Sequence, residues 1–75
     1  MEIKDARIAA GLTRAQLSEQ TGISFRTIEA YEQGRKDING AKLKTLLKLC
    51  QALGCSLSEL LTDEETKELL KQTKI

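Results

Sequence analysis

The chain has no histidine among its 75 residues, and it has only two cysteines, Cys50 and Cys55. Without an imidazole, neither a Cys/His zinc site nor a Cys/His catalytic pair can form. Histidine is also the side chain that most often acts as a general acid or base in catalysis. The sequence contains no recognisable glycine-rich phosphate loop or paired-carboxylate pocket. We therefore expect no enzymatic activity, no metal site and no cofactor, and we expect the cysteines to pack in the core as small apolar side chains.

Aromatic residues are almost as scarce, since Phe25 and Tyr31 are the only two. Hydrophobic residues nevertheless make up 40% of the chain. The core must then consist of Leu, Ile and Ala, which favours closely packed helices and an all-α fold. No apolar run approaches the roughly 20 residues of a membrane span, and the first residues lack the apolar centre of a signal peptide. The expected location is the cytoplasm, with no membrane contact.

An excess of one charge is also lacking, because the formal net charge is only +1. Its distribution is uneven: from Arg14 to Lys48 the sequence holds seven basic and four acidic residues. Further acidic residues gather near the C-terminal end, at Glu59, Asp63, Glu64, Glu65 and Glu68. Any nucleic-acid binding must therefore depend on where charges are placed rather than on bulk attraction.

Hydrophobic spacing and glycines predict four helices, at about residues 3–10, 14–20, 25–33 and 43–53. Thr13 with Gln16, and Ser24, supply the N-caps of the second and third. The fourth is the most apolar and carries an apolar stripe of Leu43, Leu46, Leu47, Cys50 and Leu53. A glycine follows each of the four segments within two residues, at positions 11, 22, 34 and 54.

Capping signals continue beyond Gly54. Ser56 and Glu59 form a capping box that predicts a short fifth helix, and Thr62 with Glu65 repeats the same spacing. The last segment has few apolar residues, so a sixth helix would be marginal unless it contacts a partner. We therefore divide the chain into a domain at residues 1–61 and an extension at residues 62–75, which is available to a protein partner.

The most informative stretch runs from Arg14 to Gln33: two capped helices joined by a turn of about three residues that contains Gly22. Leu17, Ile23, Ile28 and Tyr31 can face inward together. Glycine suits the tight turn because a positive φ costs it little. This spacing is typical of a helix-turn-helix unit.

At these residues the chain resembles the phage-repressor (Cro/CI, Xre-like) helix-turn-helix family. The resemblance rests on Gly11-Leu12-Thr13, Leu17-Ser18, Gly22-Ile23-Ser24, Thr27-Ile28, Glu32-x-Gly34, Leu46-Leu47-Lys48-Leu49 and Ala52-Leu53-Gly54. It implies a five-helix bundle whose third helix enters the major groove, and dimers that bind palindromic operators. It also implies an ion pair between Arg7 and Glu32. Ser18 and Thr21 depart from the family's usual apolar residues, so we expect weaker packing between the second and third helices.

Helical periodicity places Ile28 and Glu32 toward the core and leaves Phe25, Arg26 and Ala30 outside, where we expect contacts with DNA bases. Glu29 is expected to restrain Arg26. Phosphate contacts are expected from Arg14, Ser24, Thr27, Gln33, Arg35, Lys36 and Lys42. The alternative for Phe25 is packing against a neighbouring helix, and for each basic residue it is a solvated surface position.

These observations predict a sequence-specific, double-stranded DNA-binding transcriptional regulator, a repressor, that acts as a homodimer. The dimer is motivated by Leu60, Leu61, Leu69 and Leu70 near the C-terminal end. A protein-interaction module such as an antitoxin or anti-repressor, with secondary DNA binding, is the alternative, and the low net charge and the acidic end motivate it.

Overall fold

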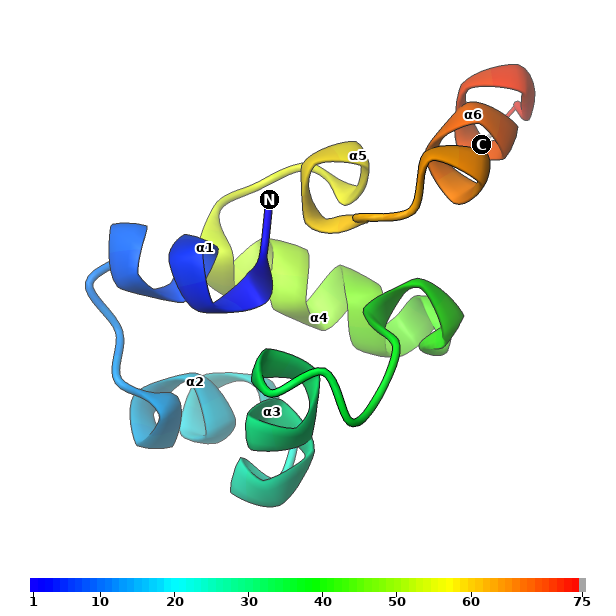
Figure 1. Ribbon diagram of the computed structural model, residues 1–75. Helices are drawn as coiled ribbons and strands as arrows, with labels where there is room; N and C mark the ends of the chain where they lie inside the picture. Colours follow the sequence, from blue (N-terminus) through cyan, green and yellow to red (C-terminus); the bar gives the residue numbers. More distant parts are fainter. Residues whose placement is uncertain (75) are drawn as a thin grey trace.

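The computed structural model describes residues 1–74, which form helices and loops without a strand. The elements are α1 (Ile3–Ala9), α2 (Arg14–Thr21), α3 (Phe25–Glu32), the short 3-10 helix η1 (Ile38–Gly40), α4 (Leu43–Leu53), α5 (Leu57–Leu60) and α6 (Glu64–Gln72) (Figure 1). The all-α bundle of five helices followed by a sixth is thus confirmed. Ile75, the last residue of the predicted extension, lies outside the described residues. None of the helices within residues 1–74 has the length and apolar character needed to cross a membrane.

The predicted caps explain where α2, α3 and α5 begin. Thr13 accepts from the Gln16 backbone N–H while the Gln16 side chain accepts from the Thr13 N–H, and Ser56 and Glu59 repeat this reciprocal pair at α5. The start of α6 differs from the prediction, because Asp63 rather than Thr62 caps it. The Thr62 hydroxyl is instead directed to Asn39, from whose Nδ2 it accepts a hydrogen bond at 2.9 Å.

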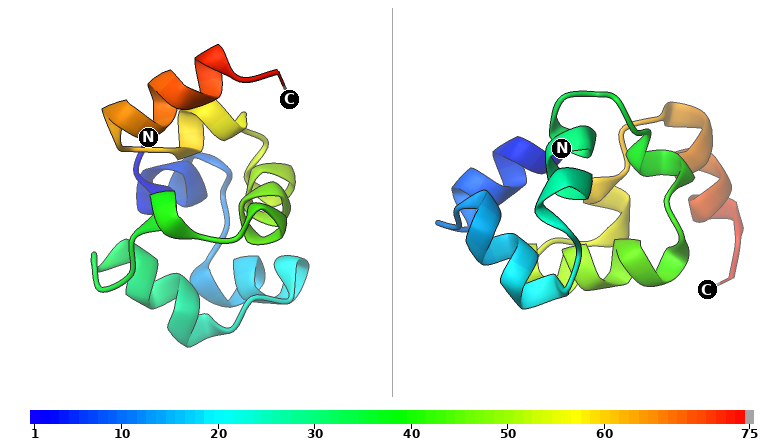
Figure 2. Two further views of the ribbon diagram at one scale, coloured as in Figure 1. Left: turned by 90° about the vertical axis from the view of Figure 1, so that its right-hand side faces the viewer. Right: turned by 90° about the horizontal axis from the view of Figure 1, so that it is seen from below.

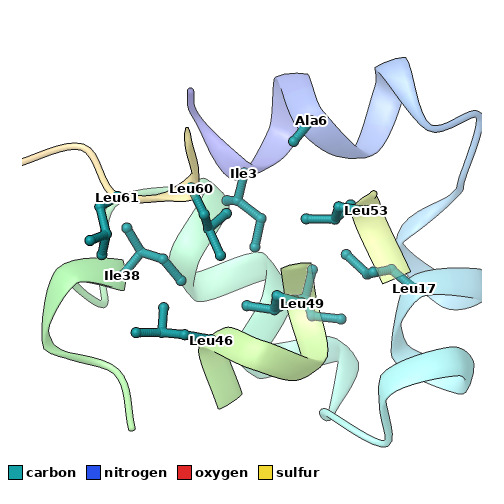
Figure 3. Close-up of a cluster of buried hydrophobic side chains, with 10 residues drawn as sticks. Ile3, Ala6, Leu17, Ile38, Leu46, Leu49, Leu53, Leu60 and Leu61 are labelled. Atoms are coloured by element: carbon teal, nitrogen blue, oxygen red, sulfur yellow. The ribbon is translucent and has the colours of Figure 1, made fainter. Parts of the chain in front are cut away.

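The core is a cluster of aliphatic side chains contributed by α1 to α5 and η1 (Figure 3). Its fully buried members are Leu17, Ile28, Leu49 and Leu60. Around them lie Ile3, Ala6, Ile38, Leu46, Leu53 and Leu61. The cysteines and Leu70 are partly buried against this cluster.

Two predictions about leucines are wrong. On α4 the buried stripe runs through Leu46, Leu49 and Leu53, so the predicted members Leu43 and Leu47 do not face the core and are each 52% exposed. Leu60 and Leu61 are buried and cannot form a dimer surface. Of the four leucines considered for that role, only Leu69 is largely exposed.

The helix-turn-helix pair and α6 lie at opposite ends of the molecule. Figure 1 shows α2 and α3 at the bottom and α6 at the upper right, and the turned view in Figure 2 keeps the same separation. Asn39 joins η1 to the start of α6, because its Oδ1 accepts from the backbone N–H groups of Thr62 and Asp63 at 2.9 and 3.0 Å. The acidic end of the chain is therefore held away from α3.

Candidate nucleic-acid interface

The turn between α2 and α3 is fixed by hydrogen bonds that the sequence pattern alone did not predict. Gly22 ends α2 with φ of 73°. The Ser18 hydroxyl donates to the Ile23 carbonyl oxygen at 2.6 Å, and the Thr21 hydroxyl donates to the Leu17 carbonyl oxygen at 2.7 Å and accepts from the Ile23 N–H at 3.2 Å. The two departures from the family pattern thus place satisfied hydroxyls at the turn. The expectation of weaker packing there does not follow, because neither hydroxyl is left without a partner.

The end of α3 is tied to α1 and α2 through one carboxylate. Glu32, whose side chain is 1% exposed, accepts from Arg7 Nε at 2.8 Å and from Arg14 Nε at 3.0 Å. Arg7 also donates to the Leu12 carbonyl oxygen at 2.9 Å. Burial alone would raise the pKa of Glu32, but the hydrogen bonds from the two arginines outweigh it and the pKa is lowered. Arg7 and Glu32 are therefore brought together, and Arg14 joins them.

The N-terminal half of α3 presents two side chains to solvent. Phe25 is 44% exposed, so it is not packed beneath a neighbouring helix, and Arg26 is exposed beside it. Arg26 makes no ion pair with any residue of the described chain. A guanidinium without a carboxylate partner retains its donors for a ligand.

Ala30 does not lie on this exposed face, contrary to the predicted outer position from which its base contact was expected. The residue is only 8% exposed. The chain turns back at this point after α3 ends, and the backbone N–H groups of Arg35 and Lys36 both donate to the Ala30 carbonyl oxygen, at 2.9 and 3.2 Å. Helical periodicity did not reveal this because the turn depends on the segment that follows the helix.

Glu29 is also placed differently from the prediction. It does not restrain Arg26; its carboxylate lies 3.7 Å from Arg14 Nη1 and 3.5 Å from Arg35 Nη2. The three residues come from α2, α3 and the segment after α3. No sequence spacing signals such a group, since Arg14 and Glu29 are fifteen positions apart.

The remaining predicted phosphate contacts surround α3. Ser24 caps the helix, and its hydroxyl lies 2.8 Å from the Thr27 hydroxyl. Thr27, Lys36 and Lys42 line one shallow hollow of about 550 Å³, together with Ile23, Tyr31 and Thr45 among others. Gln33, Arg35, Lys36 and Lys42 are all exposed. The structure thus gathers most of the predicted polar contacts around one helix.

Comparison with known proteins identifies the family to which these residues belong. A helix-turn-helix family model matches residues 3–60, which span α1 to α5. The cryptic phage CTXphi transcriptional repressor RstR of Vibrio cholerae is 32% identical over 65 residues. That alignment covers 87% of this chain and 56% of the repressor, so the chain spans little more than half of its relative's length. No solved structure matches the chain. The capped helices, the glycine turn and the extent of the family match together show that the chain belongs to the helix-turn-helix family.

Proposed function

We propose that the protein is a sequence-specific regulator of transcription, a repressor, that binds double-stranded DNA in the cytoplasm with α3 in the major groove. The observation that carries the proposal is the exposed pair Phe25 and Arg26 at the start of α3, a helix whose far end is fixed by the buried Glu32. A rigid helix with free donors on its outer face suits reading of base edges. The similarity to a phage repressor supports the same assignment.

The contacts divide into two groups. Arg26 donates to guanine O6 and N7, a contact that discriminates by roughly 1 to 3 kcal/mol, and Phe25 contacts a thymine methyl group. Polar groups around α3 that are exposed or partly exposed contact the backbone phosphates and set the register: Arg14, Ser24, Thr27, Gln33, Arg35, Lys36 and Lys42. Arg14 contacts phosphate through the terminal nitrogens of its guanidinium, because its Nε donates to Glu32.

The proposed binding unit is a homodimer on a palindromic operator. A single α3 reads few base pairs, and helix-turn-helix dimers read two half-sites about one helical turn apart. A net charge of +1 gives one chain little electrostatic affinity, so two linked recognition helices suit it better. Light scattering of the protein on its preferred duplex is expected to give two chains per duplex, and one chain per duplex would contradict the dimer.

The test of sequence-specific binding is selection of bound duplexes from a random library. We expect one palindromic motif whose half-sites lie about ten base pairs apart. Arg26→Ala should then relax the preference at one position in each half-site, whereas Lys36→Gln should weaken all duplexes alike and reduce the salt dependence. Recovery of unrelated duplexes only would contradict the proposal.

A protein-interaction module is the second candidate, because α6 carries the exposed Leu69 among acidic residues at the end opposite α3. Leu69→Ser separates the two candidates. Under the proposed function, this variant keeps the base preference of the unaltered chain. If binding another protein is the main activity, DNA binding is secondary, and Leu69→Ser should abolish the complex with that protein.

A further inference from the structure

Glu29 lies on α3 between two basic residues of the proposed DNA-binding face. Its carboxylate oxygens lie 3.7 Å from Arg14 Nη1 and 3.5 Å from Arg35 Nη2. The side chains remain accessible, with 31% of Arg14, 32% of Glu29 and 60% of Arg35 exposed. A DNA backbone that approaches these arginines therefore meets an anion already in place.

We propose that Glu29 competes with DNA phosphates for Arg14 and Arg35 and thereby limits the affinity of the protein for the DNA backbone. The inference rests on the proposed function, because it concerns the same DNA-binding face. A carboxylate and a phosphate use the same guanidinium donors. Each arginine must exchange one anion for the other when DNA binds, and the charge of Glu29 also repels nearby phosphates.

The charges around α3 support this role. Arg14 is held in addition by Glu32, at 3.0 Å, whereas Arg35 has Glu29 as its ion-pair partner among residues 1–74. Arg26 stands apart from the group. The competition therefore acts on proposed phosphate contacts and leaves the proposed base contact free, so its effect is the same for every DNA sequence.

A different role for Glu29 makes a different prediction. A glutamate on a recognition helix can accept a hydrogen bond from cytosine N4, which would make it a reader of one base pair. Removal of the carboxylate would then change the preference at that position. Competition with the backbone predicts no change in preference.

The experiment compares the unaltered protein with Glu29→Gln on random-sequence duplexes and on all single-base variants of the selected duplex. We expect every duplex to bind about two- to tenfold more tightly, and the salt dependence to become steeper by about one phosphate contact. Unchanged or weaker binding, or an altered preference at one base pair, would overturn the inference.

Two further variants isolate the local effect. Glu68→Gln removes the same charge from α6 at the opposite end, and it should leave affinity within about twofold, because screening weakens charges more than about 10 Å away. An equal gain in this variant would mean that net charge alone is responsible and would overturn the inference. When Glu29→Gln is combined with Arg35→Gln, the gain should shrink, because one of the released arginines is missing; an undiminished gain would contradict the role of Arg35.

Failure of the inference differs from failure of the proposed function. If the unaltered protein binds a selected duplex no more tightly than random ones, the proposed function is wrong. If it discriminates normally and Glu29→Gln has no effect on affinity or salt dependence, only the inference is wrong. Thermal unfolding of each variant checks that the helices remain folded.

Discussion

At the scale of single residues, Glu32 holds three helices together. Its carboxylate is almost fully buried and accepts from Arg7 and Arg14. Glu32→Gln leaves the Arg7 charge without its partner, and loss of one member of such a pair typically lowers the free energy of unfolding by about 3 to 5 kcal/mol. Urea unfolding measures this loss. The matched control is the exposed Glu19, where Glu19→Gln should change stability by less than about 0.5 kcal/mol; equal effects would contradict the role of Glu32.

The same carboxylate gives the fold a dependence on acid. Because the folded-state pKa of Glu32 is lowered from 4.5, its contribution to stability is present above about pH 4.5 and is lost as the pH falls through the lower folded value. Urea midpoints measured from about pH 6 down to pH 3 should therefore fall more steeply for the unaltered protein than for Glu32→Gln. Parallel curves would show that other groups account for the acid sensitivity.

Cys50 should react slowly with alkylating reagents. Burial, and then the neighbouring Cys55 thiol and the charge of Glu59, raise the pKa of Cys50 to about 11. Only the thiolate reacts, so at neutral pH iodoacetamide should modify Cys50 roughly three-hundredfold more slowly than a thiol with an unperturbed pKa of about 8.5. In the Cys55→Ser variant, mass spectrometry measures the alkylation of Cys50 alone. This substitution also removes the part of the rise in the Cys50 pKa that Cys55 causes. Alkylation at the rate of a free cysteine would contradict this prediction.

At the scale of elements, the turn between α2 and α3 depends on one backbone conformation. Gly22 has φ of 73°, and a Cβ atom built there would meet no atom within 4 Å. The cost of Gly22→Ala is therefore conformational, and we expect a loss of about 1 to 2 kcal/mol in the free energy of unfolding. Gly40→Ala is the control, because its site is equally open and its φ is not positive. Similar urea midpoints for both variants would contradict the claim.

Local signals in the sequence predicted the helices well. Capping pairs such as Thr13 with Gln16 act within one turn, and glycines at helix ends adopt the left-handed conformation without help from distant residues. The ion pair between Arg7 and Glu32 could be predicted only from the family resemblance, because the two residues are far apart in the sequence. Where a helix begins at a side-chain cap or ends at a glycine, the signal spans only three or four residues and can be recognised in the sequence.

The errors concern contacts that depend on distant parts of the chain. Thr62 has the right spacing for a cap, but Asn39 occupies its hydroxyl. Ala30 has the periodicity of an outer residue, but the segment after α3 turns back toward it. Leu47 belongs to the apolar stripe of α4, but that stripe is wider than the face of α4 that packs against the core, so Leu47 remains exposed. In each case tertiary packing decides between positions that are equivalent in an isolated helix.

At the scale of the whole molecule, the low net charge and the position of the acidic end both bear on how the protein discriminates between DNA sequences. The acidic α6 lies at the end opposite α3, so its charge does not mask the basic residues around that helix. Among residues 1–74, Glu29 is the acidic side chain that lies between two proposed phosphate contacts. Under the proposed function, discrimination between DNA sequences comes from Arg26 and Phe25 rather than from attraction to the backbone.

The most direct test of this account is the ratio of two dissociation constants, measured by fluorescence anisotropy at physiological salt. One is for the selected duplex and the other is for a shuffled duplex of the same length and base composition. The account predicts that the selected duplex binds at least about a thousandfold more tightly, the lower range for specific DNA-binding proteins. Equal affinity for the two duplexes would contradict it.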